Sequence, residues 1–360
     1  MRVLPFLFIS LLIFVTCQNK PTEPKPDDDE FVFPPDTSAP GSRDYVWEID
    51  STFMKMPYRN QHRIWGDAPN NIWVAGTGAD MLKAVMRFDG EKWIAMNEGT
   101  TIGIDVWSLW GFSENDVWVG GNDADMIHYI NGEREQIKIP LLEDHKDLCI
   151  SDIWGESPNE IWAAGAAVNI KTNQYDGIIL KYDGVKWEYF GIPTSGIGFL
   201  EVSKSKNENE LYFLSSKPEG EEYSDSSGVF ILNNYLTHKI YGSGTLLNES
   251  PAFSEISKEL FIAFNFGLHK YYKGKFYKIK DLSDYGIYAS RIFGRSLNDL
   301  FYKTTYGIGH YNGKDAIEIY HNNTIFRIRE AVILENDVYF LCFYYPESKE
   351  FILHGKKRQE

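Results

Sequence analysis

The sequence predicts an all-β fold in which a four-stranded unit is repeated around a ring, and three observations support this prediction. A phrase built on Trp-Gly and Asn-Asp or Asn-Glu recurs along the chain at spacings of 38 to 50 residues. Tyr, Phe and Trp make up 15% of the 360 residues, and aromatic residues favour strands. Each copy holds four short apolar runs separated by turn signals, mainly Asp-Gly and Asn-Gly pairs. This combination is typical of a β-propeller.

The repeat is clearest in its first three copies. Residues 64–76 read Ile-Trp-Gly-Asp-Ala-Pro-Asn-Asn-Ile-Trp-Val-Ala-Gly, and residues 109–121 and 153–165 follow the same pattern. In later copies Tyr or Phe replaces the Trp that follows the Asn-Asp turn. The residues at this position are Trp73, Trp118, Trp162, Tyr212, Phe261, Phe301 and Tyr339. We therefore predict a seven-bladed β-propeller of four-stranded blades over residues 44–360.

The closure of the ring can also be predicted. Residues 45–50, Tyr-Val-Trp-Glu-Ile-Asp, precede the first copy and match the outer-strand phrase Lys-Trp-Glu-Tyr at residues 186–189. The last copy ends in the charged residues 356–360, which are poorly suited to an outer strand. We predict that the N-terminal strand completes the last blade, because this pairing removes an open sheet edge.

The repeat phrase resembles that of secreted bacterial propeller proteins built on Trp-Gly-x-Ser-x-Asn-Asp-Val-Trp repeats. Residues 266–271, Phe-Gly-Leu-His-Lys-Tyr, are distantly similar to a phrase in the sensor propellers of two-component regulators. The resemblance covers residues 45–360. It implies a fold and no catalytic residue, because members of the group differ widely in role.

The N-terminus has the features of an export signal. Arg2 precedes an apolar run over residues 3–15, which is too short to span a bilayer. The run ends before Cys17 and resembles a bacterial lipoprotein signal, in which the Cys carries the lipid. We expect a signal peptide at residues 1–16, a lipid on Cys17 and a flexible Pro-rich, acidic tether over residues 17–43. A plain secretory peptide is the alternative.

This N-terminal reading also predicts a location. A lipidated Cys17 implies attachment to the outer membrane in a bacterial cell envelope. The acidic run at residues 27–30 resembles an export signal for the cell surface, and solvation of the tether is its alternative explanation.

Composition narrows the partners. A net charge of −15 argues against nucleic acid, which needs a basic face, and against anionic lipid, so we expect membrane contact through the lipid anchor only. None of the eight His residues has metal-ligand spacing, and we predict no metal or other cofactor. Cys149 and Cys342 fall in different blades and are expected to be free thiols. We expect a monomer.

Candidate site residues come from the innermost strands. Trp107 lies outside the repeat positions, where it could stack on a sugar, anchor a peptide or simply fill a packing gap. In each copy, the residue two positions before the Trp of the Trp-Gly pair, or before its equivalent, is expected to face the propeller axis. The resulting cluster consists of Arg63, Ser108, Asp152, Arg291 and Arg329, with Val202 and Pro251 in the most diverged copies. Such an arginine cluster suits an anionic ligand such as a uronate. A salt-bridge network between blades is the alternative.

The sequence contains no recognisable nucleophile or acid–base pair. We therefore predict a surface-anchored, non-catalytic binding lipoprotein that presents a propeller face to a glycan or a protein. One alternative is a glycan-active enzyme, a lyase or hydrolase, with catalytic groups on the long loops at residues 166–176, 215–227 and 344–350. Another is a scaffold subunit of an envelope complex.

Overall fold

The computed structural model describes residues 31–50, 60–77, 84–96, 105–206, 209–216, 227–242, 251–287, 291–344 and 349–358. The chain divides into two units, Met1–Pro34 and Pro35–Glu360. Only residues 31–34 of the first unit are described, and they form no regular element. The predicted signal peptide, Cys17 and the acidic run therefore lie outside the described residues.

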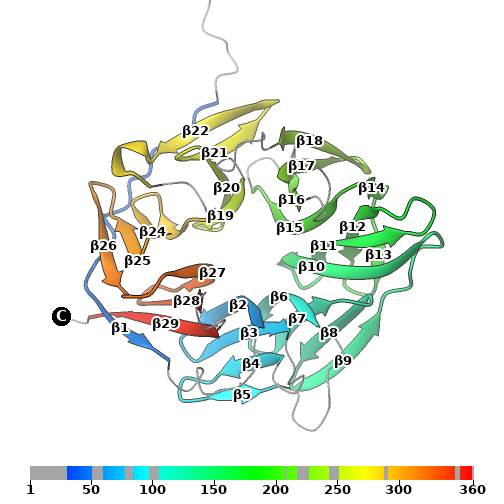
Figure 1. The fold of residues 1–360 in the computed structure, drawn as a ribbon, viewed down its shortest axis with the longest axis horizontal. Coiled ribbons are helices and arrows are strands. Elements are labelled where there is room, and N and C mark those ends of the chain that lie inside the picture. Colours follow the sequence, from blue (N-terminus) through cyan, green and yellow to red (C-terminus); the bar gives the residue numbers. More distant parts are fainter. Residues whose placement is uncertain are drawn as a thin grey trace, which may run out of the picture. The chain divides into compact units, whose positions relative to one another are not determined.

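The second unit consists of antiparallel sheets, and Figure 1 shows them arranged around a common axis. Each sheet follows chain order from an innermost to an outermost strand. The first sheet contains β2(Asn60–Ala68), β3(Asn71–Thr77), β4(Val85–Phe88) and β5(Trp93–Ala95). The second contains β6(Val106–Ser113), β7(Asp116–Gly121), β8(Asp125–Ile130) and β9(Glu133–Lys138). The third contains β10(His145–Ser157), β11(Glu160–Asn169), β12(Tyr175–Tyr182) and β13(Trp187–Tyr189), with β14(Thr194–Ser195) paired to β12.

The later sheets repeat this plan. A four-stranded sheet contains β15(Gly198–Lys204), β16(Leu211–Ser216), β17(Ser227–Asn233) and β18(Leu236–Gly242). An eight-stranded sheet has two halves: β19(Ala252–Ile256), β20(Glu259–Phe264), β21(Gly267–Tyr272) and β22(Lys275–Asp281), then β23(Phe293–Ser296), β24(Asp299–Lys303), β25(Gly307–Tyr311) and β26(Ala316–His321). Only one parallel pair, Ile256 with Gly294, joins the halves.

The last sheet combines the two ends of the second unit. It contains β27(Phe326–Ile333), β28(Asp337–Tyr344), β29(Lys349–Lys357) and β1(Tyr45–Ile49). β1 pairs antiparallel with β29, which confirms the predicted closing strand. Trp47 lies opposite Gly355, where a Cβ atom would come within 2.5 Å of the indole. The glycine therefore makes room for Trp47 to pack on Tyr320 and Phe340.

The fold is all-β, as predicted. The described part of the chain contains one short 3-10 helix, Ser283–Tyr285. Among the described residues, no helix has the length and apolarity needed to cross a membrane. The repeat aromatic residues form the core between sheets; Trp73 and Trp118, for example, are each 1% exposed.

The predicted tether needs one adjustment. Residues 36–43 contact the half-sheet β23–β26, through hydrogen bonds from Gly41 N to Asn298 O (2.9 Å) and from Asn298 Nδ2 to Ser38 O (3.2 Å). Arg43 forms an ion pair with Asp315 (2.6 Å). These residues cannot bury a core, but their backbone groups satisfy those of a neighbouring turn. Of the predicted 17–43 tether, the last eight residues are thus fastened to the propeller.

A repeated trio of side chains explains the histidines. The acid that begins the second strand of a sheet pairs with a cationic or imidazole group on the third strand, as in Asp116 with His128 and Asp337 with His354, both at 2.7 Å. The imidazole stacks on the repeat aromatic, with 3.7 Å between His128 and Trp118. His128 and His354 therefore have a structural role within their sheets.

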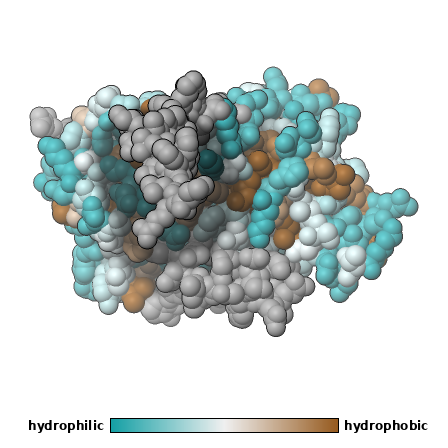
Figure 2. All heavy atoms as spheres, turned by 90° about the horizontal axis from the view of Figure 1, so that it is seen from above, coloured by the Kyte–Doolittle hydropathy of each residue, from teal (hydrophilic) through white to brown (hydrophobic). Residues whose placement is uncertain are grey.

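The exterior is hydrophilic over much of the side seen in Figure 2, with hydrophobic atoms in smaller groups between the hydrophilic side chains. Among the exposed apolar residues, Ile192 and Tyr235 are both 63% exposed and lie together, since Ile192 N donates to Tyr235 O. Cys149 and Cys342 are free thiols, as predicted.

Candidate functional site

The candidate site lies on the innermost strands, at one register position. The residue paired with each repeat aromatic is Trp65, Trp110, Trp154, Ser203, Ser254, Phe293 or Val332. Two residues before these partners lies a set that we call the inner ring. Its members are Arg63, Ser108, Asp152, Glu201, Ala252, Arg291 and Glu330.

The sequence prediction of this ring was wrong in the diverged copies. Arg63, Ser108, Asp152 and Arg291 occupy the expected position, but Glu201, Ala252 and Glu330 replace the predicted Val202, Pro251 and Arg329. The physical reason is that Ser203, Ser254 and Val332 take the place of the Trp that marks the register elsewhere.

This correction reverses the charge of the cluster. The prediction gave three arginines and one aspartate, whereas the inner ring holds two arginines and the carboxyl groups of Asp152, Glu201 and Glu330. Such a ring has no surplus of cations. The argument for an anionic ligand held by an arginine cluster therefore fails.

Arg63 joins sheets that are not neighbours. Its Nη2 donates to Ser151 O at 2.9 Å, and its Nε lies 3.6 Å from Asp152 Oδ1, both on β10. Between these strands β6 presents only the small Ser108, so the long side chain can pass. Asp152 Oδ2 accepts a hydrogen bond from Val202 N at 3.0 Å, which continues the network to β15.

Arg291 plays the same part on the opposite side. It forms ion pairs with Glu201 and, at 3.5 Å, with Glu330 Oε1. Ala252 on β19 leaves room for the reach to Glu201. Glu330 Oε2 accepts a hydrogen bond from Ile64 N at 2.9 Å, next to Arg63. The network therefore closes around the axis, which is the inter-blade alternative that the sequence left open.

The inner ring shifts the proton affinity of its carboxyl groups. Burial raises the pKa of Asp152 to about 7, against the opposing effect of Arg63 and with a contribution from Glu201. Burial also raises the pKa of Glu330, although Arg63 and Arg291 oppose it. Since three carboxyls face two guanidinium groups, the cluster is neutral when it holds one proton. Burial favours the protonated form of both Asp152 and Glu330, so this proton belongs to the coupled pair.

A second layer of side chains adjoins the ring. His62, Trp107 and Arg329 each precede a ring residue and lie at a bulge, where the pairing skips one residue. His62 stacks on Trp107 with 4.4 Å between centroids and 15° between planes. Arg329 Nη1 lies 2.6 Å from His62 Nδ1, and Nη2 donates to Glu350 Oε1 at 3.3 Å. Burial, followed by Arg329 and Arg63, lowers the pKa of His62 to about 4, so the imidazole is neutral.

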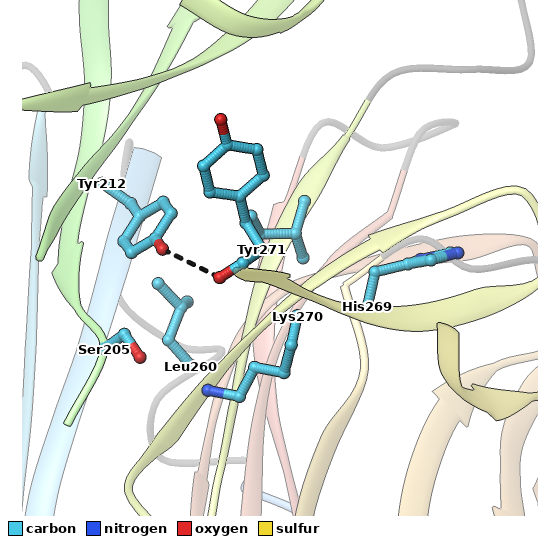
Figure 3. Close-up of a pocket in the computed structure, with 7 residues that line it drawn as sticks. Ser205, Tyr212, Leu260, His269, Lys270 and Tyr271 are labelled. Atoms are coloured by element: carbon cyan, nitrogen blue, oxygen red, sulfur yellow. Dashed lines mark hydrogen bonds between the residues drawn. The ribbon is translucent and has the colours of Figure 1, made fainter. Parts of the chain in front are cut away.

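A small cavity lies elsewhere, between β15–β18 and β19–β22 (Figure 3). Its volume is about 10 Å³, room for one water molecule. Tyr212 donates a hydrogen bond to Tyr271 O at 3.5 Å across it, and Lys270 on its wall pairs with Glu259. Glu259, Lys270 and Phe261 form one copy of the repeated trio of acid, cation and aromatic residue. The cavity is too small for an organic ligand, so the inner ring remains the candidate.

Metal chemistry finds no support in the geometry. Within the described ranges, no three His, Cys, Asp or Glu side chains are arranged to hold a metal ion, and this includes the ring carboxyls. What the ring offers is two carboxyl groups with raised pKa, Asp152 and Glu330, beside two guanidinium groups. General acid–base catalysis uses carboxyl groups of unequal proton affinity.

Comparison with known proteins supports the fold. No family model and no curated protein matches the sequence. Similar solved structures include YCF48 bound to D1 peptide, with 14% identity, a TM-score of 0.56, and coverage of 89% of this chain and 100% of that one. YCF48 from Cyanidioschyzon merolae has 12% identity, a TM-score of 0.52, and coverage of 86% and 98%.

An enzyme is also among the similar structures. Oligogalacturonate lyase from Vibrio parahaemolyticus has 10% identity, a TM-score of 0.52, and coverage of 89% of this chain and 99% of that one. The prediction that this chain is not an enzyme is therefore wrong as an argument from fold, because the same fold carries a lyase. The chain has the fold of the β-propellers, which include both binding proteins and enzymes.

Proposed function

We propose that the protein is a glycan-active enzyme that cleaves a glycosidic bond with the carboxyl groups of its inner ring. The observation that carries this proposal is the buried Asp152, with a pKa of about 7, close to further carboxyl groups and to Arg63. We also propose that the propeller has seven blades, with the halves β19–β22 and β23–β26 counted separately because a single residue pair joins them.

The chemistry follows from unequal carboxyl groups. Glycoside hydrolysis needs one protonated carboxyl as acid and one ionised carboxylate as base or nucleophile. Asp152 supplies the proton to the leaving oxygen as the glycosidic C–O bond breaks. Glu201, ion-paired with Arg291, is the candidate for the second role, in which it takes the proton of the water that forms the new C–O bond. In a lyase the second group instead removes a proton next to a uronate carboxyl group.

The test is activity on a panel of purified neutral and acidic polysaccharides. New reducing ends alone indicate hydrolysis, whereas ultraviolet absorbance of an unsaturated product indicates a lyase. Asp152→Asn should lose activity at least a hundredfold, in the range that acid–base groups contribute. Asp147→Asn is the matched control, because Asp147 lies on the same strand with an exposed side chain. Absence of cleavage by the wild type on the whole panel, or an active Asp152→Asn with normal turnover, would refute the proposal.

We further propose that Cys17 anchors this enzyme to the outer membrane and that residues 18–35 act as its tether. The lipoprotein-like N-terminus and the attachment of residues 36–43 to the propeller support this division. Cys17→Ala should release the protein from the membrane fraction and abolish labelling with palmitate. Retention of both label and membrane association in the variant would rule out this anchor.

A further inference from the structure

We propose that Trp107 is a stacking platform for one sugar ring of the substrate, held in place by His62, Arg329 and Glu350. This inference rests on the proposed function and names a recognition subsite for it. Trp107 is 38% exposed, although it begins an innermost strand whose next residue, Ser108, is fully buried. The pairing with β7 passes from Val106 to Ser108, so the bulge leaves Trp107 turned out of the ladder.

The platform is supported from behind. His62 covers one side of the indole at 4.4 Å and nearly parallel. Arg329 fixes His62 through Nδ1, and His62 Nε2 lies 3.4 Å from Thr77 Oγ1. Arg329 is itself held by Glu350, which is 2% exposed. The guanidinium group of Arg329 also lies 4.8 Å from the ring centroid of Phe343. Such a chain of contacts, from a buried carboxylate to an exposed indole, pre-orients an aromatic residue before any ligand arrives.

The platform lies next to the acid. His62 and Arg63, Trp107 and Ser108, and Ser151 and Asp152 are corresponding pairs on β2, β6 and β10. Arg63 crosses from the first pair to the third, where it donates to Ser151 O at 2.9 Å. β6, which carries Trp107, packs against β10, which carries Asp152, so a ligand on the indole and the ring carboxyl group belong to adjacent innermost strands.

The chemistry of the platform favours a sugar. The indole offers an apolar face for the C–H groups of a pyranose, and the neutral His62 adds no charge to repel or attract it. The adjacent ring supplies carboxyl and guanidinium groups for the hydroxyls. An aromatic peptide side chain could also stack on an indole, but a phenyl ring brings no hydroxyl groups to the polar ring beside it.

Binding can be measured without cleavage in the Asp152→Asn background. Cellohexaose, xylohexaose and hexagalacturonate serve as probes in calorimetry and in tryptophan fluorescence titrations. Adding Trp107→Ala should weaken the affinity for the bound probe about tenfold, whereas Trp107→Phe should keep most of it. Tyr235→Ala, which removes another exposed aromatic residue, is the control and should change nothing. His62→Ala should weaken binding less than Trp107→Ala and should broaden the fluorescence response.

The outcomes separate this inference from the proposed function. Unchanged affinity in Trp107→Ala, with a wild type that still cleaves glycans, would overturn the platform alone. Binding that depends on Trp107 in a protein that cleaves no glycan would support the platform and overturn the enzyme. Trp107-dependent binding of an aromatic peptide, with none of the three oligosaccharides bound, would overturn the sugar assignment.

Discussion

Replacement of Asp152 by Asn should change how the stability of the protein depends on pH. The pKa of this carboxyl is about 7 in the folded protein and 3.8 ordinarily. The folded state therefore binds a proton more tightly than the unfolded chain does. The stability linked to this group is fully present below pH 3.8 and is lost as the pH rises through 7. Asn cannot titrate, but its side-chain oxygen can still accept the hydrogen bond from Val202 N.

The size of the effect follows from the pKa difference. Each pKa unit corresponds to about 1.4 kcal/mol, so ionised Asp152 costs the folded protein up to about 4 kcal/mol at pH 8. The side chain is 17% exposed, and the nearby Arg63 and Glu330 take part in the same titration. We therefore expect a measured difference of about 2 to 4 kcal/mol.

Urea unfolding at pH 5, 6, 7 and 8 measures this difference. Across this range the wild type should lose stability relative to Asp152→Asn, so that the variant is the more stable protein at pH 8. Asp147→Asn, which replaces an exposed carboxyl on the same strand, should follow the wild type. Identical pH profiles for the wild type and Asp152→Asn would refute the reasoning, because His62, whose pKa is lowered to about 4, contributes equally to both proteins.

Three further predictions concern the architecture. Deletion of residues 18–35 should leave the melting temperature nearly unchanged, whereas deletion of residues 18–49 should cost several kcal/mol, because it removes β1 and the buried surface of Trp47; equal melting temperatures would contradict the closing role of β1. Gly355→Val should lower the free energy of unfolding, measured with urea, by about 1 to 3 kcal/mol, because the new side chain collides with the indole of Trp47. An unchanged free energy of unfolding would show that the sheet edge can shift. Arg291→Gln should lower the free energy of unfolding by about 3 kcal/mol at pH 8 and by less at pH 5. The reason is that Glu201 and Glu330 lose their cation and can protonate only at lower pH. An equal loss at both pH values would argue against the ion pairs.

The sequence predicted the fold well because its signals are local. The phrase around Trp73 contains the turn, the buried aromatic and the following strand within a few residues, and it recurs often enough to define the unit. The pairing of β1 with β29 was also predictable, because a single orphan strand phrase at one end matched a missing strand at the other.

The candidate site was predictable only in part, because its register is not local. Trp65, Trp110 and Trp154 mark the position of Arg63, Ser108 and Asp152, so these residues were found. In the diverged copies no such marker remains. Glu201 and Glu330 were missed because Ser203 and Val332 stand where the first three copies have a Trp, so the count began one residue away from the true position. A pattern of small residues between long charged ones could have pointed to the ring, but only with the correct register.

The two arginines of the inner ring have a consequence for how the molecule unfolds. In most repeat proteins each unit touches only its neighbours, so the chain can open one unit at a time. Here Arg63 reaches past β6 to β10, and Arg291 reaches past β19 to Glu201. Loss of the sheet that carries one of these arginines therefore also removes a contact with a sheet two places away. Such second-neighbour coupling makes partial opening unfavourable, and the propeller should melt in a single cooperative transition.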